Sequence, residues 1–144
     1  MVGSRIVRQL TLISCMFLIA VSVFAQAQPG KSEYEPHPYQ EGKDVVWVPT
    51  EQALTNKMLD LAKVTPQDYV IDLGSGDGRI VITAARQGAR ALGIEYNTDL
   101  VALSKQNAMK AGVTDKAQFV EADLFESDFS RATVITMFLL PEIN

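Results

Sequence analysis

Hydrophobic and polar positions follow two alternating periodicities from residue 69 onward. Short apolar runs that end in turn residues predict strands over 69–73, 91–95, 117–120 and 133–140. Between these runs, apolar residues recur at helical spacing over 80–87 and 98–111, and the second segment stops at Gly112. Strands that alternate with helices in this way predict a parallel sheet with right-handed crossovers, a doubly wound α/β fold.

A further amphipathic helix is predicted ahead of the first strand, over residues 50–64, with Thr50 as its N-cap. The apolar face of this helix is formed by Leu54, Met58, Leu61 and Ala62. Residues 28–44 are polar and interrupted by prolines, which predicts a flexible linker. The folded domain is therefore expected to occupy residues 45–144.

The first 27 residues have the pattern of a secretory signal peptide. Arg5 and Arg8 precede an uncharged apolar run over 10–25, and small residues at Ala25 and Ala27 suit signal peptidase. The alternative is an uncleaved membrane anchor, but the run has 16 residues, and a spanning helix needs roughly 18 or more. Export to the periplasm or secretion is predicted, with membrane attachment only if this segment is retained.

Composition and charge narrow the possible partners. With 47% hydrophobic and 21% charged residues, the 144-residue chain suits one globular domain. Cys15, the single cysteine, lies in the signal segment; the mature domain is expected to form no disulfide and no thiolate metal site, and no metal is predicted. The net charge is −4, and it becomes −6 without Arg5 and Arg8. Such an acidic domain is a poor partner for nucleic acid.

A glycine-rich loop follows the first predicted strand of the sheet. Gly74, Gly76 and Gly78 permit backbone angles that side chains disfavour and allow a ligand to approach the main chain. The helix that begins near Arg79 directs N–H groups and a positive dipole end at the same place, which suits an anionic group. Ligands of such folds bind at the carboxyl ends of the strands, so this loop marks a candidate site.

The acids around this loop indicate which ligand it takes. The glycine spacing is G-x-G-x-G, one residue shorter than the dinucleotide fingerprint G-x-G-x-x-G. Asp72 suits a cationic group of the ligand, and Glu95, at the end of the second strand, suits the two hydroxyls of a ribose. Asp123 is placed to accept a hydrogen bond from an adenine amino group, and Leu124 to cover the base. S-adenosylmethionine (SAM), with an ammonium, a carboxylate and an unmodified ribose, matches this set.

At these residues the chain resembles the class I SAM-dependent methyltransferases, with Asp72 to Gly78 as their first motif and Glu95 as the acid of the second. Residues 48–50, 58–59 and 72–81 resemble more narrowly the FAM173-type lysine methyltransferases, which modify mitochondrial proteins. The resemblance implies a Rossmann-like fold and methylation of a protein side chain, lysine in that group. It also implies that residues 72 and 74–78, including Ser75 and Asp77, hold the methionine end, and that Thr50 lies near the reactive end. It assigns no catalytic residue.

Members of that family continue with three more strands, whereas this chain stops at Asn144. We therefore expect an incomplete domain, truncated after the fourth strand, with that strand as an exposed hydrophobic edge. Two other functions remain open at this point. One is a SAM-binding or nucleotide-binding module without catalysis, and the other is an NAD-dependent oxidoreductase, which the glycine spacing disfavours.

Overall fold

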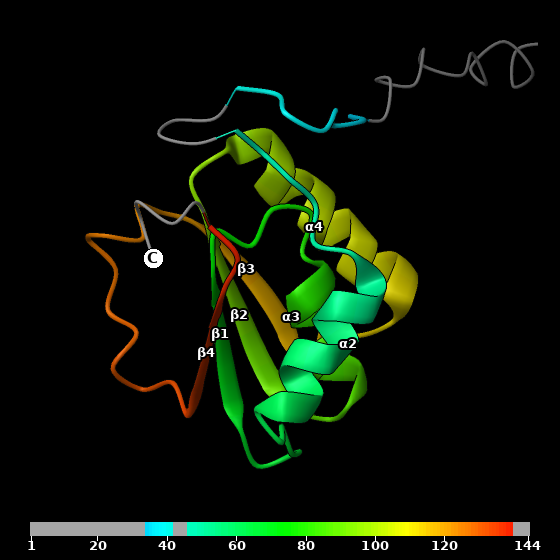
Figure 1. Ribbon diagram of the computed structural model, residues 1–144, viewed down its shortest axis with the longest axis vertical. Helices are drawn as coiled ribbons and strands as arrows, with labels where there is room; N and C mark the ends of the chain where they lie inside the picture. Colours follow the sequence, from blue (N-terminus) through cyan, green and yellow to red (C-terminus); the bar gives the residue numbers. More distant parts are fainter. Residues whose placement is uncertain (1–33, 42–45, 140–144) are drawn as a thin grey trace, which may run out of the picture. The chain divides into compact units, whose positions relative to one another are not determined.

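The computed structural model describes residues 34–41 and 46–139. Within them, four parallel strands pack against three helices (Figure 1). The strands are β1 (Tyr69–Leu73), β2 (Arg90–Glu95), β3 (Ala117–Glu121) and β4 (Val134–Met137). The helices are α2 (Gln52–Leu61), α3 (Arg79–Arg86) and α4 (Thr98–Ala111). The predicted alternation of strand and helix is confirmed.

The strand order in the sheet is β3-β2-β1-β4, so the first strand, β1, lies in the interior of the sheet. It runs outward through β2 and β3 and then returns to the other side of β1, where β4 pairs with it in parallel. The direction of winding therefore reverses between β1 and β4. This reversal is the switch point of a doubly wound α/β fold, and it confirms the predicted fold class.

Different structures cover the two faces of the sheet. The three helices lie on one face, and the connection from β3 to β4 crosses the other (Figure 1). Successive residues of a strand point to opposite faces. Accordingly, Val70 belongs to the core under the helices, while Ile71 belongs to a smaller apolar cluster with Ile94 and the connection.

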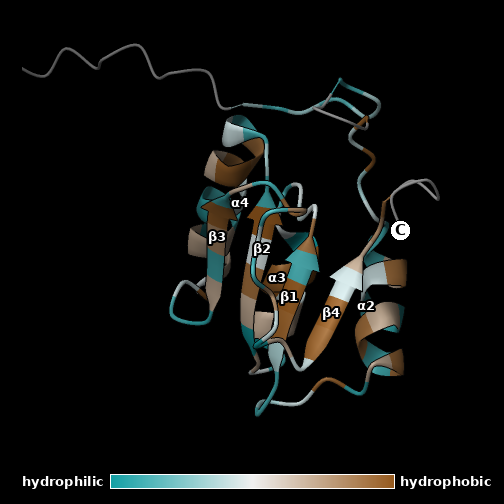
Figure 2. Cartoon of the chain, turned by 90° about the vertical axis from the view of Figure 1, so that its left-hand side faces the viewer, coloured by the Kyte–Doolittle hydropathy of each residue, from teal (hydrophilic) through white to brown (hydrophobic). Residues whose placement is uncertain are grey.

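Strand β4 forms one edge of the described sheet, and its residues toward the helix-free face are partly uncovered. Ile135 and Met137 are 43% and 40% exposed, and Figure 2 shows the hydrophobic colouring of β4 from this side. In the described sheet, β4 thus has a partly exposed apolar surface on this face.

Helix bounds match the prediction best where both ends carry capping residues. Asn97 accepts hydrogen bonds from the backbone N–H groups of Asp99 and Leu100 at 2.9 and 3.2 Å. At the other end, Gly112 adopts the left-handed conformation, with φ of 69°. These two caps define α4 over 98–111, as predicted from the sequence.

The predicted N-cap of α2 is wrong, and of its predicted apolar face only Met58 packs against the core. The carbonyl of Thr50 accepts a hydrogen bond from Arg79 Nη1 at 2.6 Å, and the first carbonyl used by the helix is that of Glu51, which is the N-cap. Leu54 and Leu61 are 41% and 71% exposed. The buried residues of α2 are Thr55 and Leu59, so the packed face is turned by one residue from the predicted one.

The described part of the predicted linker, residues 34–41, forms a turn that pairs with the segment before α2. Tyr39 N–H donates to the carbonyl of Trp47 at 2.7 Å, and Trp47 N–H donates to the carbonyl of Gln40 at 3.0 Å. The predicted signal peptide lies outside the described residues. In the ranges that the structure describes, no helix has the length and apolar character needed to cross a membrane.

Candidate functional site

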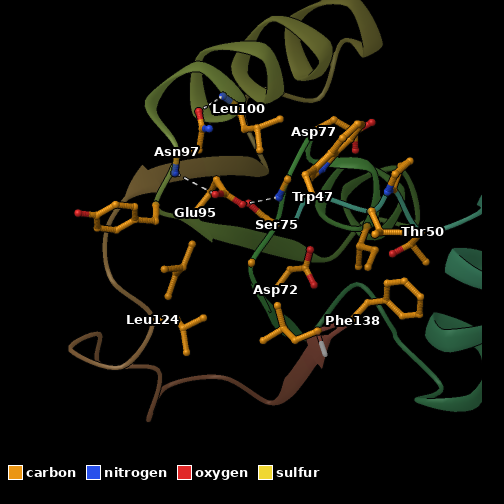
Figure 3. A pocket seen from close by; sticks show the side chains of 18 of the residues that line it. Trp47, Thr50, Asp72, Ser75, Asp77, Glu95, Asn97, Leu100, Leu124 and Phe138 are labelled. Carbon is orange, nitrogen blue, oxygen red and sulfur yellow. Dashed lines mark hydrogen bonds between the residues drawn. The ribbon is translucent and has the colours of Figure 1, made fainter. Parts of the chain in front are cut away.

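A cavity of about 300 Å³ opens at the carboxyl ends of the strands (Figure 3). Its wall contains every residue predicted to hold a cofactor except Gly78. These residues are Thr50, Asp72, Gly74, Ser75, Gly76, Asp77, Glu95, Asp123 and Leu124. The fold therefore brings together side chains from residues 50 to 124 at the place where a doubly wound sheet binds its ligand.

The glycine loop is held in place by hydrogen bonds to β2. Gly74 and Ser75 donate their N–H groups to the carbonyl of Ile94 at 2.9 and 3.0 Å, and Gly76 donates to Glu95 Oε2 at 2.9 Å. Gly74 and Gly76 have φ of 73° and 54°, which L side chains rarely adopt. Three successive amides of the loop are thus used inside the protein.

Gly78 does not line the cavity, which corrects the predicted set. A Cβ at this position would lie 2.7 Å from the ring of Phe119 and 2.8 Å from Ser104 Cβ, and the backbone has φ of 83°. Gly78 is the N-cap of α3. Its role is to let α3 begin close against β3 and α4.

Glu95, at the end of β2, presents its carboxylate between the glycine loop and the start of α4. Oε2 accepts from Gly76 N–H and Oε1 accepts from Asn97 N–H, each at 2.9 Å (Figure 3). Each oxygen of a carboxylate accepts more than one hydrogen bond, so both can still receive a hydroxyl. Asn97 was not predicted as part of the site, although an N-cap residue two positions after a strand-end acid was a visible signal.

Asp72 lies at the bottom of the cavity and is 2% exposed. Its Oδ1 accepts a hydrogen bond from Thr136 Oγ1 at 2.7 Å, across the β1–β4 pair. Burial raises the pKa of Asp72 to about 7, the charges of Glu95 and Asp77 act in the same direction, and the hydrogen bond from Thr136 opposes them. Thr136 was also missed, and its only signal in the sequence was a polar residue within an apolar strand.

Asp77 was predicted to hold a cofactor, but its carboxylate is directed at Arg79. The guanidinium donates to it through Nε at 2.9 Å and Nη2 at 2.6 Å, and through Nη1 to the carbonyl of Thr50. The hydrogen bonds to Asp77 raise the pKa of Arg79 above its ordinary value. Arg79 therefore joins the glycine loop to the segment that precedes α2.

The far wall of the cavity is apolar and follows β3. Leu124 and Ala122 pack against the cluster that contains Ile94, and Asp123 Oδ1 accepts from Phe125 N–H at 2.9 Å. The hydroxyl of Ser75 is buried and has no hydrogen-bond partner among the described residues. An apolar slot beside polar groups suits a ligand that combines an aromatic base with a polar chain.

Metal binding is not indicated in the part of the chain that the structure describes. No group of three or more His, Cys, Asp and Glu side chains there is arranged to hold an ion.

A reversed parallel sheet, a glycine loop after β1 and an acid at the end of β2 are the features expected of a class I methyltransferase. Residues 72–144 match the ANTKMT methyltransferase domain. The chain belongs to this family, which confirms the family predicted from the sequence.

Individual relatives agree with this assignment. The chain is 44% identical over 113 residues to a protein-lysine N-methyltransferase of Saccharolobus islandicus, covering 77% of this chain and 66% of the relative. It is 36% identical over 100 residues to a human lysine N-methyltransferase named for an ATP synthase component, covering 68% of this chain and 43% of the relative. The chain thus spans about two fifths to two thirds of the length of these relatives.

A solved structure of an RNA methyltransferase from Salinibacter ruber, in complex with S-adenosyl-L-homocysteine, is also similar. It is 54% identical, with a TM-score of 0.66, and the match covers 67% of this chain and 63% of that one.

Proposed function

We propose that this protein is a SAM-dependent methyltransferase whose acceptor is a lysine side chain of a protein. The observation that carries the proposal is the pair of acids Asp72 and Glu95. Both line one cavity at the switch point of the parallel sheet. When bound there, SAM supplies an activated methyl group for in-line transfer to a nucleophile. The protein's main task is then to position the two reactants.

The residues of the cavity fit SAM by the chemistry of their groups. The Asp72 carboxylate is placed for the ammonium, the remaining lone pairs of Glu95 for the ribose hydroxyls, and the Leu124 wall for the adenine. A cavity of about 300 Å³ lies within the usual range of small-molecule sites, roughly 300–1,000 Å³.

Lysine is proposed as the acceptor because both protein relatives described above are lysine methyltransferases by name. Lysine must lose its proton before it attacks, and burial lowers the pKa of an amine. Val48, Pro49 and Phe138 give the cavity an apolar wall near Thr50. This wall supports the proposal because it would desolvate an entering ammonium.

RNA is the second candidate acceptor, supported by the described activity of the similar Salinibacter ruber protein. The charge of the chain disfavours it, because the net charge is −4 and a phosphate backbone needs a basic surface. Incubation with labelled SAM, a protein extract and total RNA separates the two. Label in protein that survives ribonuclease supports lysine, and label lost with ribonuclease supports RNA.

Glu95→Gln is expected to weaken binding of S-adenosylhomocysteine about tenfold or more, because hydrogen bonds to a charged group are lost. The amide would also direct an N–H group at one of two backbone donors. Isothermal titration measures the change. The matched control is Glu121→Gln. Glu121 is exposed and lies on β3, where it pairs in register with Glu95 of β2.

Binding of S-adenosylhomocysteine by the wild type, together with an unchanged affinity in the control, supports the proposal. If the protein binds NAD and not S-adenosylhomocysteine, the proposed function is wrong. An undiminished affinity in the Glu95 variant would instead remove only the ribose role.

Export is a separate proposal that depends on residues 1–27. Their basic start, apolar run and small residues at 25 and 27 favour cleavage after Ala27. Expression of the full chain in a bacterial host is expected to yield a periplasmic protein whose first residue is Gln28. A cytoplasmic protein that retains its start would contradict this.

A further inference from the structure

We propose that the indole N–H of Trp47 is a hydrogen-bond donor for the carboxylate of the SAM methionine group. This inference rests on the proposed function, since it assigns a residue to one end of the same cofactor. It differs from the prediction made from the sequence, in which the glycine loop and the start of the following helix receive that carboxylate.

The donors expected for an anion are largely engaged within the protein. The N–H groups of Gly74, Ser75 and Gly76 already donate to Ile94 and Glu95. The N–H of Arg79, the first residue of α3, is directed at Asp77 Oδ1 at 3.3 Å. A carboxylate at this end of the cavity therefore gains from a donor outside the loop.

The residues that line the cavity carry mostly negative charge, which disfavours a carboxylate without a directed donor. Of the described residues that line it, Arg79 is the one base, and its guanidinium is used by Asp77 and by the carbonyl of Thr50. The lining acids are Glu41, Asp72, Asp77, Glu95 and Asp123. An anionic group is repelled by these carboxylates unless a directed donor holds it.

Trp47 places a neutral donor against the glycine loop. A Cβ at Gly76 would lie 2.6 Å from Trp47 Nε1, so the ring nitrogen is in close contact with the loop backbone. Figure 3 shows the indole beside Asp77, across the cavity from Leu124. The backbone bonds of Trp47 to Tyr39 and Gln40 fix the segment that carries it.

The test compares SAM with decarboxylated SAM, which keeps the ammonium and lacks only the carboxylate. In the full chain, Trp47→Phe retains an aromatic ring and removes the N–H. We expect this variant to bind SAM about tenfold more weakly, as for a lost hydrogen bond to a charged group. Its affinity for decarboxylated SAM should stay within about twofold of the wild type. Titration calorimetry gives both affinities, and urea unfolding shows whether the variant is folded.

A control variant separates the donor from the aromatic wall. Phe138 also lines the cavity but has no polar side-chain atom, so Phe138→Leu should change the affinities for both ligands by the same factor. If Trp47→Phe also weakens both equally, the indole acts only as a cover and the proposal is wrong. Unchanged affinities in Trp47→Phe would overturn it as well. Failure of the wild type to bind either ligand would count against the proposed function itself.

A second readout needs no substitution of the binding residue. Trp47 is the only tryptophan of the chain, so the intrinsic fluorescence of the wild type reports on its surroundings. A carboxylate placed at the indole N–H is expected to shift the emission with SAM more than with decarboxylated SAM. Equal shifts with the two ligands would contradict the proposal.

Discussion

Replacing Asp72 with asparagine is expected to stabilise the ligand-free protein by about 2–4 kcal/mol at pH 8. The pKa of Asp72 is about 7 in the folded protein and 3.8 in the unfolded reference. Between these values the folded state holds a proton that the unfolded state has lost. The wild type therefore loses stability as the pH rises from about 4 to about 7, by about 1.4 kcal/mol for each unit.

The same substitution should have little effect on stability at pH 4, where Asp72 is protonated in the folded state. Asparagine Oδ1 still accepts the hydrogen bond from Thr136, so the contact between β1 and β4 is retained. Urea unfolding at pH 4 and pH 8 measures the difference. Asp115→Asn, in the exposed turn before β3, is the control. A gain of equal size at both pH values would contradict the expectation.

Asp72→Asn is also expected to weaken cofactor binding, because the ammonium loses its charged partner. The buried carboxylate thus lowers the stability of the ligand-free protein but strengthens binding of the cationic ligand. Binding of a cation lowers the pKa of Asp72, so binding near pH 7 should release a proton. Calorimetry in two buffers with different ionisation enthalpies detects this release.

Replacing Gly78 with alanine is expected to destabilise the protein by about 2–4 kcal/mol. A left-handed backbone costs an alanine about 1 kcal/mol, and overlap in a packed core adds typically 1–3 kcal/mol. The overlap is with Phe119 and Ser104, which would lie 2.7 and 2.8 Å from the new Cβ. Because the distances involve side chains of β3 and α4, both elements would have to shift.

Gly112→Ala is the matched control for this substitution. Gly112 is also left-handed, with φ of 69°, but no atom lies within 4 Å of a Cβ built there. It should therefore show only the backbone cost, about 1 kcal/mol. Urea unfolding of the two variants separates strain from overlap, and equal losses would show that Gly78 is not sterically required.

The elements that the sequence predicted best are those whose ends carry their own signals. Asn97 and Gly112 bound α4, and the glycines after Leu73 end β1. The face of α2 was mispredicted because apolar residues occur on both of its sides, and Leu54 points outward while Thr55 is buried. Periodicity cannot choose between such faces, since the choice depends on how the helix meets α3.

The candidate site was predictable where one short motif supplies the residues. Asp72, the glycines and Glu95 come from two adjacent strand ends, which parallel pairing must bring together. Trp47 lines the cavity from the segment before α2, and Thr136, 64 residues after Asp72, reaches the Asp72 carboxylate from β4. Their roles depend on tertiary contacts that no local sequence pattern records. The hydrogen bonds of the loop amides to β2 could not be predicted from the sequence for the same reason.

The pairing of β1 with β4 also has a consequence for the order in which the site is assembled. Asp72 and Thr136 are 64 residues apart, and β4 is the last of the four strands along the chain. Its contacts with β1 can therefore form only after the other three strands have been synthesised. During synthesis, the glycine loop and Glu95 can take their places well before β4 leaves the ribosome. The carboxylate at the base of the cavity obtains its hydroxyl partner only when β4 joins, so we expect cofactor binding to mark the end of folding.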